Sequence, residues 1–110
     1  MTKTQTIVSA IFLSLLFSTG ARANGESTAN TDAGKALAKQ LCARCHAIEQ
    51  TGDSPFEPAP PFRMLPHKYE LENLEEALAE GISVGHEAMP EFEFSPEQID
   101  QFLAYLRTLN

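Results

Sequence analysis

The chain lacks the residue patterns that usually carry catalysis or nucleic-acid binding. No paired carboxylates, nucleophile–base set or phosphate-binding loop stands out among its 110 residues. We therefore expect no enzyme activity of its own and no small-molecule substrate. Positive charge is scarce, since 8 lysines and arginines stand against 15 aspartates and glutamates. The formal net charge of −7 is typical of a solvated surface and argues against a nucleic-acid partner, which needs a basic patch.

The sequence also lacks an apolar run long enough to span a bilayer comfortably, which takes about 20 residues. A shorter run covers 7–17, with Lys3 before it and the small-x-small pattern Ala21-Arg22-Ala23 after it. This order is typical of a secretory signal peptide over 1–23, cleaved after Ala23. The alternative is a membrane anchor, but we expect no stable anchor. The prediction is one domain over 24–110, exported from the cytoplasm.

Cysteine is scarce as well, and both cysteines lie in one motif, Cys42-Ala43-Arg44-Cys45-His46. The pattern C-x-x-C-H is the attachment signature of a c-type haem. Each thiol adds across a haem vinyl group, and the imidazole of the histidine ligates the iron. In a helical turn these three side chains share one face, because they stand at i, i+3 and i+4. We predict that Cys42 and Cys45 anchor haem c and that His46 is an axial ligand.

Three other interpretations of the two cysteines compete with haem. A thioredoxin-like redox pair needs a βαβ context, and the chain shows no clear strand pattern. A zinc site would need His67 and His86, whose spacing matches no usual zinc finger. The third is a pair of buried apolar cysteines beside an unrelated histidine. The complete motif favours haem over all three.

The first half of the domain is expected to hold one helix and one long loop. Residues 24–30 are small and polar, and we expect a flexible start there. Thr31 or Asp32 then caps a helix that runs to about Cys42. Five prolines and a glycine fall within 50–66, which predicts an irregular loop wrapped around the histidine side of the haem.

Two further helices are expected in the second half. One covers about 70–80 and ends at Gly81, a residue that suits a helix C-terminus. The last has a clear start signal, with Ser95 as N-cap, Pro96 in the first turn and Gln98 completing a capping box. Its apolar stripe must pack on another helix, and the natural partner is the first helix, on the face with Leu37 and Leu41. The stripe consists of Ile99, Phe102, Leu103 and Leu106.

Met89 is the main candidate for the second axial ligand. Pro90 biases Met89 away from helical dihedrals, so its side chain projects from a loop. A thioether is a soft ligand that favours reduced iron, and the chain between His46 and Met89 is long enough to reach the far haem face. His86, in the same loop, is the rival ligand. Met64 is a poorer candidate, and a methionine that merely fills a core gap is the remaining alternative.

The chain resembles the class I c-type cytochromes. The resemblance rests on three features in this order: the haem motif, Met89-Pro90 before a capped final helix, and Ala104-Tyr105-Leu106 within that helix. The resemblance is to the small bacterial periplasmic monohaem members and covers nearly all of 24–110. It implies an all-α, cytochrome c-like fold. In that fold three to five short helices enclose one covalently bound haem c, and the terminal helices cross.

The resemblance also implies roles for individual residues. Gly34 corresponds to the small residue at the helix crossing and Tyr105 to its aromatic partner. Pro60 corresponds to the proline whose carbonyl accepts a hydrogen bond from the proximal histidine, with Pro58 as the alternative. Arg63 is a candidate partner for a haem propionate, with a surface arginine as the alternative.

The function implied is periplasmic electron transfer. The iron cycles between Fe(III) and Fe(II) under His46/Met89 ligation and exchanges electrons with transient redox partner proteins. One alternative is a haem subunit of a periplasmic dehydrogenase or oxidase complex. The other, which holds if Met89 does not ligate, is a five-coordinate haem sensor that binds small gaseous ligands.

Overall fold

The computed structural model describes residues 23–81 and 88–109. The predicted signal peptide, apart from Ala23, and the rival ligand His86 lie outside these ranges. The described chain forms a 3-10 turn and four α-helices, and it contains no β-strand, which confirms the all-α prediction. None of these helices is both long and apolar enough to cross a membrane. The elements are α1 (Ala23–Leu41), η1 (Phe62–Met64), α2 (Leu65–Lys68), α3 (Leu71–Glu80) and α4 (Pro96–Arg107).

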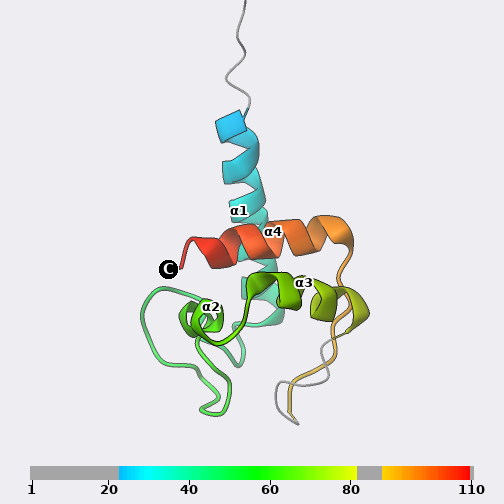
Figure 1. The fold of residues 1–110 in the computed structure, drawn as a ribbon. Helices are drawn as coiled ribbons and strands as arrows, with labels where there is room; N and C mark the ends of the chain where they lie inside the picture. Colours follow the sequence, from blue (N-terminus) through cyan, green and yellow to red (C-terminus); the bar gives the residue numbers. More distant parts are fainter. Residues whose placement is uncertain (1–22, 82–87, 110) are drawn as a thin grey trace, which may run out of the picture.

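The crossing of α1 and α4 is the framework of the fold (Figure 1). A Cβ atom on Gly34 would collide with the backbone carbonyl of Gln101 and lie 2.9 Å from the Cβ of Tyr105. Only glycine permits this approach, so the implied roles of Gly34 and Tyr105 are confirmed. Ala38, rather than Leu37, is the fully buried residue of this part of α1.

The N-terminal turns of α1 correct the prediction of a flexible start. The helix begins at Ala23, eight residues before Thr31, and these turns project away from the body (Figure 1). Thr31 and Asp32 both lie inside the helix, so neither caps it, and the Thr31 Oγ1 donates to the Ser27 carbonyl at 3.0 Å, one turn back. A threonine hydroxyl can make this bond inside a helix, and the segment contains no proline to stop helix propagation.

The two later helices agree with the prediction. Helix α3 begins at Leu71 and ends before Gly81, whose φ of +97° disfavours any side chain. At the start of α4 both capping-box bonds are present. The Gln98 amide donates to the Ser95 Oγ at 3.3 Å, and the Ser95 amide donates to the Gln98 Oε1 at 3.0 Å.

The proline-rich loop is irregular as far as Pro61 and then forms η1 and α2, so the prediction of an irregular segment to Pro66 was too long. Pro66 lies in the first turn of α2, where the missing amide hydrogen costs no helix bond. Phe62 in η1 is 3% exposed and Leu65 packs against the core, whereas Phe56 is 36% exposed.

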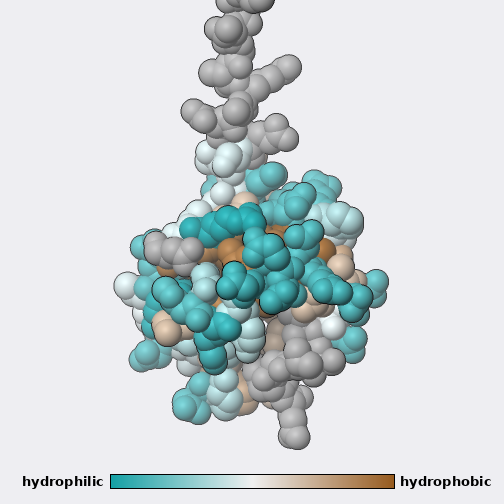
Figure 2. All heavy atoms as spheres, in the orientation of Figure 1, coloured by the Kyte–Doolittle hydropathy of each residue, from teal (hydrophilic) through white to brown (hydrophobic). Residues whose placement is uncertain are grey.

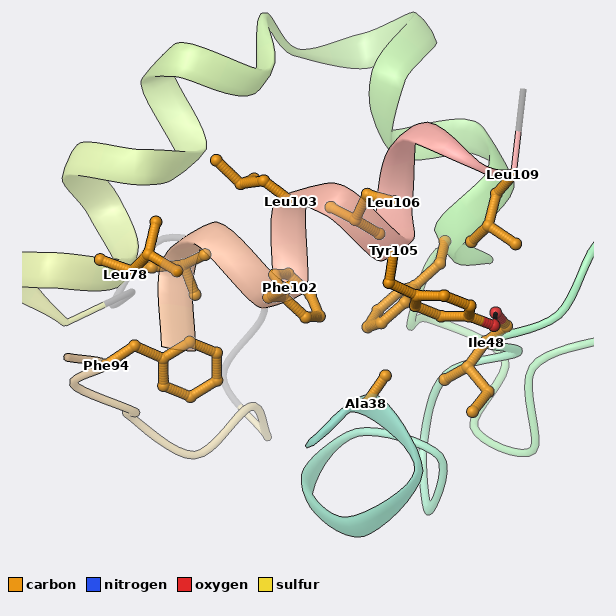
Figure 3. Packing of buried hydrophobic residues seen from close by; sticks show 11 residues of the cluster. Ala38, Ile48, Leu78, Phe94, Phe102, Leu103, Tyr105, Leu106 and Leu109 are labelled. Carbon is orange, nitrogen blue, oxygen red and sulfur yellow. Dashed lines mark hydrogen bonds between the residues drawn. The ribbon is translucent and has the colours of Figure 1, made fainter. Parts of the chain in front are cut away.

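Aromatic side chains join these elements in one core (Figure 3). Phe102 of α4 packs edge-on against Phe62 and Phe94, with ring centroids 5.5 and 5.8 Å apart. The buried Tyr105 hydroxyl donates to the Ile48 carbonyl at 2.6 Å, which ties the loop after the haem motif to α4. Hydrophilic residues cover most of one face of the body, with hydrophobic side chains visible between them (Figure 2).

Candidate functional site

The cysteine motif continues the turn that ends α1. The amides of Cys42 and Ala43 both donate to the Ala38 carbonyl at 2.9 Å. The amides of Cys45 and His46 then donate to the Cys42 carbonyl at 3.0 and 2.9 Å. Successive helix-like turns therefore place both thiols and the imidazole next to each other. Both thiols are free, and burial together with the neighbouring Cys45 raises the pKa of Cys42 to about 11.

His46 is buried and held by its Nδ1 atom. The residue is only 7% exposed, and its Nδ1 lies 2.8 Å from the Pro60 carbonyl oxygen. Because a carbonyl only accepts, Nδ1 carries the proton and Nε2 carries the lone pair that a metal needs. The bond fixes the ring orientation, and Pro60 rather than Pro58 supplies the carbonyl. The Phe62 ring lies beside the imidazole, with centroids 5.1 Å apart.

Backbone hydrogen bonds fold the proline-rich loop back onto the motif. The Phe56 amide donates to the Cys45 carbonyl at 3.1 Å, and the Phe62 amide donates to the Ala47 carbonyl at 2.9 Å. The Ala47 amide donates to the Ser54 Oγ at 3.0 Å. The loop is therefore ordered by bonds to the residues that surround His46, which places the Pro60 carbonyl.

The motif opens onto a cavity of about 790 Å³, within the range of cofactor pockets. All four α-helices, η1, the proline-rich loop and the segment before α4 contribute to its wall, which is mostly apolar. The described residues that line it are Gln40, Leu41, Cys42, Arg44, Cys45, His46, Pro58, Pro60, Phe62, Leu65, Lys68, Tyr69, Asn73, Leu74, Ala77, Leu78, Met89, Pro90, Phe92, Phe94 and Phe102.

Met89 lines the same cavity as Cys42, Cys45 and His46, although it lies far from them in the sequence. It is partly buried, whereas Met64 is 45% exposed and is not part of the cavity wall. Of the two methionines considered as iron ligands, the structure thus brings Met89 to the haem motif and leaves Met64 outside.

The structure does not bring Arg63 to the cavity. Its Nη1 donates to the Gly52 carbonyl at 2.8 Å, within the proline-rich loop. The cationic side chains that do line the cavity are Arg44 and Lys68. Sequence reasoning missed Lys68 because a lysine in a polar stretch is typical of a solvated surface; its position follows from where the loop places α2.

The residues present fit haem c and do not fit the zinc alternative. Two thiols and one imidazole meet in a large apolar cavity, which is the donor set that covalent haem attachment needs. Within the described ranges, no group of three or more histidine, cysteine, aspartate or glutamate side chains is placed to hold a metal ion. His67 is exposed on α2 and does not line the cavity.

Comparison with known families supports the same conclusion. The family model described as "Cytochrome C oxidase, cbb3-type, subunit III" matches residues 29–106, which is most of the chain and includes Cys42, Cys45 and His46. No curated protein and no solved structure matches the chain significantly. The match confirms haem c as the covalently bound, iron-containing cofactor, and it indicates a function in haem-based electron transfer. The chain therefore belongs to the cbb3-type cytochrome c oxidase subunit III family and is a class I c-type cytochrome.

Proposed function

We propose that this chain transfers electrons in the periplasm through one six-coordinate haem c, held by Cys42 and Cys45 and ligated by His46 and Met89. The observation that carries the proposal is that these four side chains line one apolar cavity, although Met89 comes from a different part of the chain. When bound, the haem supplies an iron that alternates between Fe(III) and Fe(II).

The protein's own part is to hold the two ligands and exclude water. The bond from His46 Nδ1 to Pro60 fixes the imidazole and increases its basicity. The thioether of Met89 favours the reduced iron and so raises the reduction potential. Phe62, Phe94 and Phe102 contribute apolar surface to the cavity, which keeps the site dry and limits rearrangement when the charge changes.

A second candidate role is that of a subunit in an oxidase complex. The description of the matching family favours it, because that description names a subunit of a cbb3-type cytochrome oxidase. Both roles use the same haem site and differ in how long the partner stays bound. Purification of the untagged protein from its native membranes and soluble fraction separates them. Co-elution with oxidase subunits supports the complex, and a lone soluble species supports a transient carrier.

Location is tested by the N-terminus of the mature protein. We expect export of residues 24–110 after cleavage behind Ala23, because 1–23 has the pattern of a signal peptide. Sequencing of the protein from a periplasmic fraction should begin at Asn24. A protein that begins at residue 1 and remains in the cytoplasmic fraction would contradict the proposal.

The ligand set is tested by absorption spectra of the oxidised holoprotein. The wild type should be low-spin and show a methionine-to-iron charge-transfer band. Met89→Ala should lose this band and gain affinity for exogenous ligands such as carbon monoxide in the reduced state. Met64→Ala is the matched control, because Met64 lies outside the cavity, and it should keep the band.

His86→Ala distinguishes the rival ligand and should also keep the band. A high-spin wild-type spectrum, or a band that survives in Met89→Ala, would overturn the ligand assignment and favour the five-coordinate sensor or His86 ligation.

A further inference from the structure

Ala47, the residue directly after His46, is bonded to two separate points of the proline-rich loop. Its amide donates to the Ser54 Oγ at 3.0 Å, and its carbonyl accepts from the Phe62 amide at 2.9 Å. Pro60, whose carbonyl bonds to the His46 imidazole, lies between these two points in the sequence. The intervening segment therefore forms a closed arc on Ala47, and the position of the Pro60 carbonyl depends on both ends of that arc.

The two ends of the arc differ in what they require of the sequence. The bond at Phe62 joins two backbone groups, which every residue other than proline carries. The bond at Ser54 needs the side-chain hydroxyl oxygen as acceptor. Ser54 is therefore the end of the arc that a single substitution can release.

The bond between Ala47 and Ser54 joins groups that are shielded from water. Ala47 is only 8% exposed and Ser54 is half-buried. A buried amide without an acceptor costs free energy comparable to a lost hydrogen bond. Without the hydroxyl, the backbone beside His46 must shift or admit water to satisfy the Ala47 amide. Either response changes the contact between His46 Nδ1 and the Pro60 carbonyl, which are 2.8 Å apart.

The backbone on either side of Ser54 is also bonded, so the fold places the hydroxyl. Before Ser54, the Gly52 carbonyl accepts from Arg63 Nη1 at 2.8 Å. After Ser54, the Phe56 amide donates to the Cys45 carbonyl at 3.1 Å. Ser54 thus lies in a segment attached to η1 on one side and to the haem motif on the other.

We propose that Ser54 is a positioning residue for His46, whose hydroxyl acts through the Ala47 amide to set the strength of the hydrogen bond from His46 Nδ1 to Pro60. This proposal rests on the proposed function, because it assumes that His46 ligates a haem iron. A stronger bond makes the imidazole more basic and so favours Fe(III). Loss of the Ser54 hydroxyl weakens the bond, favours Fe(II) and raises the reduction potential.

The test compares three variants of the full holoprotein, Ser54→Ala, Ser54→Thr and Ser95→Ala. Ser95 is the matched control, because its Oγ also accepts from a backbone amide, that of Gln98 at 3.3 Å, but at the start of α4. Ser54→Ala should raise the equilibrium constant for haem reduction roughly threefold, because an ordinary hydrogen bond is weakened. Ser54→Thr keeps the hydroxyl and should restore the wild-type value. Ser95→Ala should lower the urea midpoint and leave the equilibrium constant unchanged.

Proton NMR of the ferrous holoprotein measures the hydrogen bond itself. Low-spin ferrous haem is diamagnetic, so the His46 Nδ1 proton can be observed. In Ser54→Ala its signal should move upfield and its exchange with solvent should become faster, because the proton is less firmly bonded. Both properties should be unchanged in Ser95→Ala and restored in Ser54→Thr.

The wild type provides a second measurement that needs no substitution. The Ala47 amide and the His46 Nδ1 proton should show the same dependence of exchange rate on urea, because one opening of the arc releases both. This measurement decides the question if Ser54→Ala gives no holoprotein.

The proposal would be overturned by a Ser54→Ala protein that is less stable but keeps the wild-type Nδ1 signal and potential. It would also be overturned by a Ser54→Thr protein that behaves like Ser54→Ala. An Ala47 amide that exchanges independently of the Nδ1 proton in the wild type would have the same consequence.

The same samples separate this proposal from the proposed function. Covalent haem and the methionine-to-iron band are recorded in the wild type first. If both are present while Ser54→Ala matches Ser95→Ala in potential and Nδ1 signal, the positioning role fails and electron transfer stands. If the wild type is high-spin, Met89 ligation fails, and the Nδ1 proton is recorded in the ferrous carbon monoxide complex, which is diamagnetic. If covalent haem is missing from the wild type, both proposals fail.

Discussion

The two sides of the cavity, around His46 and around Met89, are constructed differently. On the His46 side, a long loop is bonded to the motif at several points, including the bond from His46 Nδ1 to Pro60 and the bond from the Phe62 amide to Ala47. On the Met89 side, the described contacts lie at the ends of the segment. The Phe94 amide donates to the Leu78 carbonyl at 2.8 Å, and Glu91 packs over Gly81.

This difference separates two tasks. The histidine is oriented by the polypeptide itself, through the bond from its Nδ1 to the Pro60 carbonyl. The segment that carries Met89 is held near Gly81, at the end of α3, and at Phe94, just before α4. We therefore expect the His46 side to govern whether the haem protein forms, and the Met89 side to govern the spin state and potential of the haem.

The largest effect should come from removing each ligand in turn. His46→Ala should reduce the yield of covalent haem protein to a small fraction of the wild type, because it removes a member of the attachment motif. Met89→Ala should keep most of the covalent haem and lose only the low-spin spectrum. Haem per polypeptide, measured as the alkaline pyridine complex, checks both. Equal yields from the two variants would remove the distinction between the two sides.

The second-largest effect should come from the crossing of α1 and α4, which supports both sides of the cavity. Gly34→Ala places a Cβ against the Gln101 carbonyl, a backbone atom that cannot rotate away. We expect it to lower the free energy of unfolding of the holoprotein by about 3 kcal/mol. Gly25→Ala is the control, because a Cβ there meets nothing within 4 Å, and it should not destabilise. Urea titration followed by circular dichroism measures both.

A smaller and more local effect should come from the two glycines with positive φ. Gly81 at the Met89 side has φ +97°, and Gly52 at the His46 side has φ +94°. Alanine at either position should cost about 1–2 kcal/mol of stability from backbone strain. In Gly81→Ala the new Cβ also meets the Glu91 carboxylate, at 2.5 Å from Oε1, whereas at Gly52 it meets nothing within 4 Å.

Gly81→Ala should therefore also weaken the bond between Met89 and the iron. Imidazole should displace the methionine at a roughly fivefold lower concentration than in the wild type, which corresponds to about 1 kcal/mol. Gly52→Ala should leave this concentration unchanged. If the two glycine variants bind imidazole equally well, the contact between Gly81 and Glu91 does not affect ligation by Met89.

Much of this site could be predicted because the residues that identify it lie close together in the sequence. The spacing of Cys42, Cys45 and His46 is itself the haem motif, and the capping box at Ser95 contains all of its partners within four residues. The roles of Gly34 and Pro60 came from the family resemblance, and the structure supplies the physical reason in a backbone contact and a hydrogen bond.

The parts that were predicted wrongly depend on weak or long-range effects. The sequence predicts that α1 starts at Thr31 or Asp32, because both residue types are good caps, yet both lie inside the longer helix and the Thr31 hydroxyl bonds to Ser27. The propionate role of Arg63 stays a prediction, but the structure places Arg63 outside the described cavity wall, where it donates to the Gly52 carbonyl. Which cation lines the cavity depends on how the whole loop folds back, and the structure shows Lys68 there instead.

The central claim, that two distant parts of the chain ligate one iron, is tested most directly by iron X-ray absorption of the oxidised holoprotein. The claim predicts one sulfur neighbour, from Met89, in addition to the nitrogens of the porphyrin and His46, and its loss in Met89→Ala. A wild-type iron without a sulfur neighbour would contradict the claim.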